Sequence, residues 1–292
     1  MLAELNLKLP SGTARSKRLE KEAEETHGVT DANRVRAVVD VYNTDYLKAV
    51  RKIHAGLRNM FAAMTLPWSE RGQRLIANVQ MKTLKGEIEK AKIEASAAWR
   101  QFEDDLDRHK ARDKQVLGTL FDESLYPSKD ELDGRHSIDV VFAAVPDAEH
   151  DVRSGWDQDT VEQYQNQVIT KEKIRTEKAL KVLGKRAHDT ISRVADRMKT
   201  YDGGKVGSYN DSLIPNAKDI INLCKLFNLN NDPDMKKMFN EMEEAIKNVS
   251  TKDTRDNEAT REHVGKVADK LAKRIKTSAL GGFGKAPELP TD

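Results

Sequence analysis

The side chains of this chain most able to do chemistry are the basic residues between Lys171 and Lys199. Ten Lys and Arg residues stand there against four acidic ones, an excess of six positive charges. Basic side chains along one helix can neutralise phosphates, which gives salt-sensitive binding to nucleic acid without base specificity. The predicted contact set has eight members: Lys171, Lys173, Arg175, Lys178, Lys185, Arg186, Arg193 and Arg197.

The same charges have a second interpretation, in which they only solubilise the outside of a helical bundle and pair with acids on neighbouring helices. Aromatic residues are nearly absent between the basic positions, so the stretch offers no obvious platform on which bases could stack. A second, smaller basic patch is made of Lys266, Lys270, Lys273, Arg274 and Lys276. Nucleic-acid contact and a solvated surface both stay open at this point.

Other kinds of site find little support. The glycine-rich stretches 203–208 and 281–285 lack the order of a phosphate-binding loop, and neither follows an expected strand. The seven histidines contain no pair at the helical spacing of four that would let one face hold a metal ion. The single cysteine, Cys224, excludes an intramolecular disulfide and a cysteine-based zinc cluster. We therefore expect no metal, no cofactor and no enzymatic activity.

The composition favours elongated helices that are exposed to solvent. Charged residues make up 34% of the 292 residues and hydrophobic ones only 38%, while the net charge of +2 excludes a uniformly basic surface. The first residues do not form a secretory signal, and no run approaches the ~18 apolar residues that span a bilayer. A cytoplasmic location without membrane contact is the expectation.

Three stretches predict long amphipathic helices. Apolar residues recur at steps of three and four from Thr30 to Met64, and again from Asn78 to Leu120 with a polar break near Asp113. These two helices are expected to pair with each other, because a helix of ~40 residues is longer than a compact domain is wide. A third long helix is predicted over Thr160–Tyr201.

Shorter elements complete the predicted fold. Residues 3–9 alternate apolar and polar side chains, and residues 137–146 are β-branched and end at a proline, so we expect two strands that pair. Residues 16–26, which are almost all charged, are expected to form a solvated helix or a mobile segment, and a short helix is expected after Tyr126. Three more helices are predicted over residues 216–227, 233–248 and 257–276.

The predicted fold class is mainly α, with long paired amphipathic helices in a coiled-coil-like bundle, a small antiparallel β element and a C-terminal helical part. The predicted divisions are residues 1–150 for the long-helix body with the β element, 151–280 for the third long helix and the C-terminal bundle, and 281–292 for a disordered tail. The last of these rests on the Gly and Pro content of the C-terminal end.

Several short segments of the chain form a recognisable set: Pro67-Trp68, Gly72 to Asn78, Leu117 to Phe121, Tyr126 to Ser128, Val140 to Pro146, Asp211 to Asn216 and Leu226 to Pro233. Together they resemble a family of uncharacterised proteins found in tailed phages and in bacterial gene neighbourhoods that encode a MoxR-type AAA ATPase and a von Willebrand factor A protein. The resemblance covers roughly residues 1–276. It implies a phage setting, in the cytoplasm of the host, and partnership with an ATPase, and it assigns no functional residues.

The leading hypothesis is a non-enzymatic, phage-type binding and assembly protein that forms homo-oligomers through its long helices and contacts DNA in phage DNA metabolism. One alternative is an adaptor that presents helices to a MoxR-type AAA ATPase and does not bind nucleic acid. Another is a structural phage component or an antagonist of host defence.

Overall fold

The apolar periodicities of the sequence become helices in the structure, a computed structural model that describes residues 1–31, 34–41, 44–69, 72–145, 158–201, 210–227 and 233–279. The chain divides into two compact units. The ribbon unit consists of Ala3–Ala63 and Val79–Phe142, and the bundle unit consists of Met1–Leu2, Met64–Asn78 and Ala143–Asp292. Each unit is described by itself.

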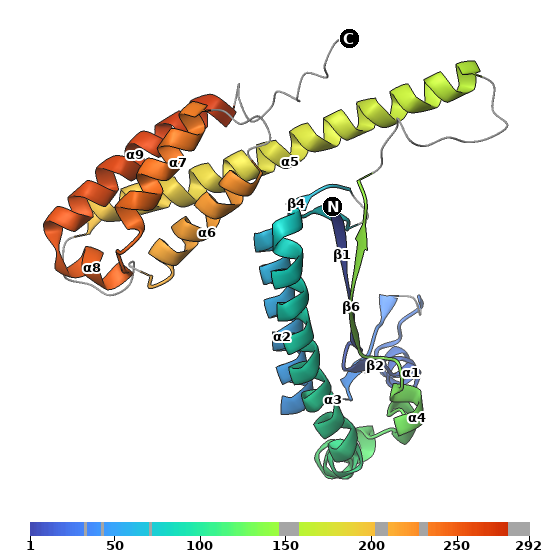
Figure 1. Ribbon diagram of the computed structural model, residues 1–292. Coiled ribbons are helices and arrows are strands. Elements are labelled where there is room, and N and C mark those ends of the chain that lie inside the picture. The colour runs from blue at the N-terminus through green and yellow to red at the C-terminus, as the bar shows by residue number, and fades with distance from the viewer. Residues whose placement is uncertain are drawn as a thin grey trace. The chain divides into compact units, whose positions relative to one another are not determined.

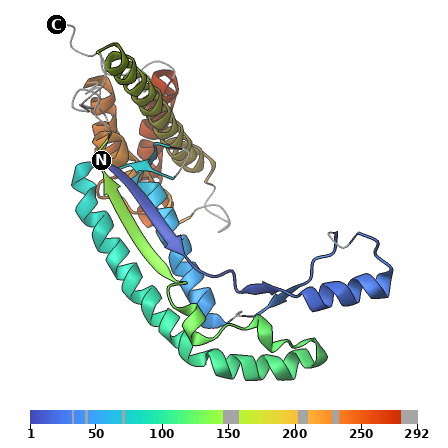
Figure 2. The same ribbon diagram turned by 90° about the vertical axis from the view of Figure 1, so that its right-hand side faces the viewer.

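The ribbon unit combines two long helices with short strands. Its elements are β1 (Leu2–Lys8), β2 (Thr13–Arg15), α1 (Lys17–His27), β3 (Val38–Asp40), α2 (Asp45–Met64), η2 (Asn78–Gln80), α3 (Met81–Leu117), η3 (Gly118–Leu120), η4 (Glu123–Leu125), α4 (Lys129–Leu132) and β6 (Ser137–Ala143). Helices α2 and α3 lie side by side in both views (Figures 1 and 2). Their buried side chains follow the predicted steps of three and four, as in Leu47, Val50 and Leu57 of α2.

Strands β1 and β6 are neighbours in the sheet, and they run in opposite directions (Figure 2). The predicted pairing of residues 3–9 with the strand before Pro146 is therefore confirmed. The charged segment 16–26 is also helical, as α1. Its hydroxyl cap is Ser16, which accepts a hydrogen bond from the Leu19 amide, and Gly28 ends the helix in the left-handed conformation.

The prediction that one helix runs from Thr30 to Met64 is wrong before Asp45, because residues 38–40 form β3 and α2 begins only at Asp45. β3 pairs antiparallel with β2, with Ala14 opposite Val39. The backbone just before β3 also forms hydrogen bonds: the Ala37 amide donates to the Glu20 carboxylate, and the Ala37 carbonyl accepts from the Ser16 amide. These bonds use backbone groups that a helix would need for itself.

Helix α3 is continuous through Asp113, where a polar break was predicted. The Asp113 carboxylate accepts a hydrogen bond from the Tyr126 hydroxyl at 2.8 Å, and His109 Nε2 lies 3.2 Å from it. The polar residue thus holds the segment that follows the helix.

The bundle unit packs its described helices around one apolar core. Its elements are β4 (Leu66–Pro67), β5 (Arg74–Leu75), α5 (Gln158–Thr200), α6 (Leu213–Leu226), α7 (Pro233–Ile246), α8 (Thr251–Asp256) and α9 (Glu258–Ala279). α5 runs alongside α9 and α6 (Figure 1). The core contains side chains that are almost completely buried, among them Leu183, Ile191, Ile214, Phe239 and Leu271.

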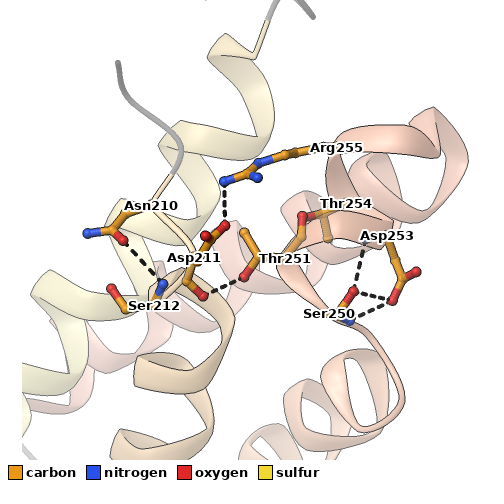
Figure 3. Close-up of polar contacts among 8 residues, drawn as sticks. All are labelled: Asn210, Asp211, Ser212, Ser250, Thr251, Asp253, Thr254 and Arg255. Carbon is orange, nitrogen blue, oxygen red and sulfur yellow. Dashed lines mark hydrogen bonds and ion pairs between the residues drawn. The ribbon is translucent and has the colours of Figure 1, made fainter. Parts of the chain in front are cut away.

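The sequence did not predict α8, which begins with a capping box. Ser250 accepts a hydrogen bond from the Asp253 amide, while the Asp253 carboxylate accepts one from the Ser250 amide at 2.7 Å. Asp211 ties this helix to the start of α6, because its carboxylate lies 2.7 Å from Arg255 and its carbonyl accepts a hydrogen bond from the Thr251 hydroxyl (Figure 3). The pattern Ser-x-x-Asp at 250–253 was the available signal.

The glycine-rich stretch 203–208 and the predicted disordered tail at 281–292 lie outside the described residues. Among the residues that are described, no helix combines the length and the apolar character needed to cross a bilayer.

Helices α5 and α9 approach each other closely at Gly265. A Cβ added there would lie 2.9 Å from the Cβ of Met198, closer than real Cβ atoms come. We expect Gly265→Ala to lower the free energy of unfolding by about 1–3 kcal/mol, because the two helices would have to move apart.

Gly86 provides a matched control, because it lies in the interior of α3 with no atom within 4 Å of an added Cβ. Gly86→Ala is expected to raise the free energy of unfolding by roughly 0.5–1 kcal/mol through helix propensity alone. Chemical denaturation followed by circular dichroism measures both. Equal stabilisation by the two substitutions would contradict the close helix contact.

Candidate nucleic-acid interface

All eight predicted contact residues lie on one helix, α5, which is uninterrupted from Gln158 to Thr200. Its second half is anchored in the bundle core by Leu183, Ala187, Ile191, Val194 and Met198. Its first half, which the structure describes completely from 158 to 178, has no buried side chain. The basic residues are therefore distributed over the packed second half of the helix and its solvated first half.

The eight residues differ in exposure. Lys171, Lys173, Lys178, Lys185 and Arg193 are exposed, whereas Arg175, Arg186 and Arg197 are partly buried. Because a helix turns by about 100° per residue, the eight do not share a single face. The structure brings them onto one element but not into one cluster.

Lys171, Lys178 and Lys185 form what we call the lysine line. They are seven residues apart, which is close to two helical turns. Each lysine is therefore rotated by only ~20° about the helix axis relative to the previous one, and the three side chains project from the same side of α5. The line is about 21 Å long at ~1.5 Å per residue. None of the three lysines forms an ion pair with a described residue, and all three are exposed.

Arg186 has an internal role. Its guanidinium donates a hydrogen bond to the Thr65 carbonyl at 3.3 Å, and Arg74 donates to the same oxygen at 3.1 Å. Burial lowers the pKa of the Arg186 guanidinium. Arg186 therefore joins α5 to the segment that leads into β4, and its charge is not presented to solvent as those of the lysines are.

The positive charge is concentrated in the first part of the basic stretch. Residues 171–186 hold seven basic and two acidic side chains, but residues 187–199 hold only three basic and two acidic ones. Asp189 follows Lys185 by four residues and Asp196 follows it by eleven, which are about one and three turns, so acidic residues replace the lysines on this side of the helix after Lys185. A binding surface on α5 is therefore centred between Lys171 and Lys185.

The second basic patch, on α9, is compensated by acids. Lys266 lies 3.3 Å from Glu262, Lys270 lies 3.1 Å from Glu241 of α7, and Lys273 lies 2.7 Å from Asp269. Lys199 of α5 also lies 2.9 Å from Asp269. The solvated-surface interpretation therefore describes the α9 patch, where most charges have partners.

The described residues contain no group of three or more His, Cys, Asp or Glu side chains that could hold a metal ion. Cys224 is buried in the bundle core, and burial raises the pKa of its thiol to about 12. Such a thiol is protonated near neutral pH and is a poor nucleophile.

Two histidines meet inside the ribbon unit. His54 of α2 is 2% exposed, and its ring lies 5.4 Å from that of His136, which in turn stacks on Trp99 of α3 at 5.3 Å. Neither ring nitrogen of His54 has a hydrogen-bond partner among the described residues. Burial lowers the pKa of His54 to about 4, with smaller contributions from His136 and Arg58. The imidazoles pack as neutral aromatic rings.

This arrangement predicts a loss of stability in acid. The unfolded state binds a proton at His54 near pH 6.5 and the folded state only near pH 4, so the contribution is present above pH 6.5 and is lost as the pH falls toward 4. The loss is about 3 kcal/mol, using roughly 1.4 kcal/mol per unit of pKa. Free energies of unfolding measured from pH 7 to pH 4 test this.

His54→Leu should remove most of that pH dependence, and His27→Gln, at an exposed position of α1 in the same unit, should leave it intact. If His54→Leu retained the full fall in stability, another group would have to be responsible.

No protein-family model, no curated protein and no solved structure matches this chain.

Proposed function

We propose that this protein is a non-enzymatic binding and assembly protein that contacts nucleic acid without sequence specificity, through the lysine line of α5. The single observation that carries the proposal is the contrast between two basic surfaces of the same unit. The α9 lysines are paired with acids, whereas Lys171, Lys178 and Lys185 are exposed and have no acidic partner among the described residues.

The physical basis is the release of counterions. Each ammonium group that meets a phosphate frees an ion condensed on the nucleic acid, so the free energy of binding depends steeply on salt. The lysines stand on a helix whose second half is fixed in the core, so binding needs to order only the side chains. Arg175, Lys173 and Lys181 flank the line and add to its potential.

Self-association through the long helices is a second part of the proposal. It is supported by Ile93 of α3, which is 70% exposed and shares one side of the helix with the exposed Ala97. Small and apolar residues at helical spacing allow two helices to approach closely. Light scattering at tens of micromolar protein tests this part, and a strict monomer would remove it. The phage setting rests on the sequence resemblance alone.

The central test is binding to fluorescent nucleic acid, followed by anisotropy across ~50–300 mM salt. The logarithm of the binding constant should fall linearly with the logarithm of the salt concentration. Replacing Lys171, Lys178 and Lys185 together by Gln should reduce that slope by about 2–3, because each phosphate contact contributes ~0.7–0.9. Affinity at low salt should fall by at least about tenfold.

The matched control replaces Lys266, Lys270 and Lys273 of α9 by Gln, which removes the same charge from residues that already have acidic partners. We expect this variant to keep most of the slope. Similar losses in the two triple variants would show that only net charge matters. If the unaltered protein bound nothing at the lowest salt, the proposal would fail and an adaptor that contacts only proteins would be favoured.

A further inference from the structure

Three aromatic rings hold the turn between α4 and β6 against the long helices of the ribbon unit. His136 belongs to this turn, and its ring lies 5.4 Å from that of His54 of α2 and 5.3 Å from that of Trp99 of α3. We call these three side chains the ring stack. Residues 133–135, which precede His136, are exposed. His136 therefore connects an otherwise exposed part of the chain to both helices.

The ring stack contains polar atoms that the described part of the chain does not satisfy. Both ring nitrogens of His54 and Nε2 of His136 are buried and have no hydrogen-bond partner there. Buried polar atoms normally have a partner, and an apolar side chain of similar size would pack at such a position at lower cost. Packing alone therefore does not explain why these two rings are imidazoles.

Protonation would make the stack much less favourable. An imidazolium has a charge and two N–H donors, all of which would be buried without a partner. The pKa of His54 is lowered to about 4, first by burial and then by the positive charges of His136 and Arg58. Burial also lowers the pKa of His136. A proton on one ring thus opposes a proton on the other.

The acids on the facing elements are engaged elsewhere. Glu103 of α3 accepts a hydrogen bond from the Trp99 indole at 2.7 Å, and it contributes to the pKa of neither histidine. Asp139 of β6 lies 3.8 Å from Lys92 of α3. On the turn itself, residues 133–135 carry their charges in solvent. The surroundings of the stack therefore do not compensate a buried imidazolium.

We propose that the ring stack is an acid-sensitive latch, which holds the turn on α2 and α3 while both imidazoles are neutral and releases the turn and the start of β6 when they take up protons. Both helices bury apolar side chains two to three turns away from the stack, such as Leu47 of α2 and Ile88 of α3. They therefore keep a core of their own when the turn leaves.

The pH range of opening follows from linkage. Above pH 6.5 neither the closed nor the open state is protonated, so the latch stays closed. As the pH falls from 6.5 toward 4, the open state binds protons that the closed state does not bind, and opening becomes more favourable. Between pH 7 and pH 5, His54 alone should raise the opening constant about 20-fold. His136 acts in the same direction.

Hydrogen exchange followed by mass spectrometry distinguishes release of the turn from global unfolding. The full-length protein is exchanged at pH 7 and pH 5 in several low concentrations of urea, and the rates are corrected for the intrinsic effect of pH. We expect the hydrogen-bonded amides of residues 135–141 to lose at least about 20-fold in protection at pH 5. Their exchange should be faster than that of α2 and α3 and nearly independent of urea, because a local opening exposes little surface.

Substitutions assign the effect to the two rings. His54→Leu combined with His136→Phe removes both titrating groups and keeps apolar side chains in the stack, so the protection of residues 135–141 should no longer depend on pH. His136→Phe alone should leave the share of His54, about 20-fold. The control is His27→Gln, at an exposed position of α1, which should retain the full effect. Circular dichroism at pH 7 shows that each variant is folded.

Three results would overturn the latch. The first is equal protection of residues 135–141 at pH 7 and pH 5, and the second is an unchanged pH effect in the double variant. The third is a single opening constant and a single urea dependence shared by residues 135–141, α2 and α3. In that case the histidines would act only on the stability of the whole unit.

Discussion

Burial of the second half of α5 determines how its first half is presented. A helix of some twenty residues that buries nothing is marginal in water, because nucleation is costly and each added residue contributes little. In this chain, residues 158–178 continue a helix that is already formed and packed from Ala179 onward. The nucleation cost is therefore met by the core, and the rotation of the solvated half is set by side chains such as Leu183 and Ile191. The direction of every lysine on the line follows from that packing.

The same packing accounts for the difference between the two basic surfaces. Within the bundle, helices run about 8–10 Å apart, so a lysine on one can reach an acid on the next. Lys270 of α9 reaches Glu241 of α7 in this way, and Lys199 of α5 reaches Asp269 of α9. Exposed pairs of this kind contribute little to stability, yet they cancel the local potential. Lys171, Lys178 and Lys185 form no such ion pair with a described residue, so their potential persists.

Sequence patterns predicted an element correctly where a periodic row of buried apolar side chains determines it. They failed where backbone hydrogen bonds to a distant segment determine it. The long helices and the paired strands β1 and β6 follow from apolar periods of three to four and of two residues. The segment 35–41 satisfies both periods, since Val35 and Val39 are four apart while Val35, Ala37 and Val39 alternate. Only its partner strand β2 and the Glu20 carboxylate, both distant in sequence, decide in favour of a strand.

For the candidate site, the sequence predicted the helix and the side chains that it carries but not how each charge is used. Arg186 differs from its neighbours because the Thr65 carbonyl lies within reach, a consequence of how the segment before β4 packs on α5. The partners of the α9 lysines are likewise set by helix packing, which no local pattern encodes. The seven-residue spacing of the lysine line was readable from the sequence, but its exposure was not.

The spacing of the lysine line also explains how the fold tolerates it. Consecutive lysines are separated by about 10.5 Å along the helix, slightly more than the Debye length of ~8 Å at physiological salt. At that distance two exposed charges repel by only about 0.4 kcal/mol in water even before screening, which is below thermal energy. The free protein therefore bears the line at little cost to its stability. Against a polyanion the situation is different, because each ammonium can meet its own phosphate and release its own counterion, and these gains add.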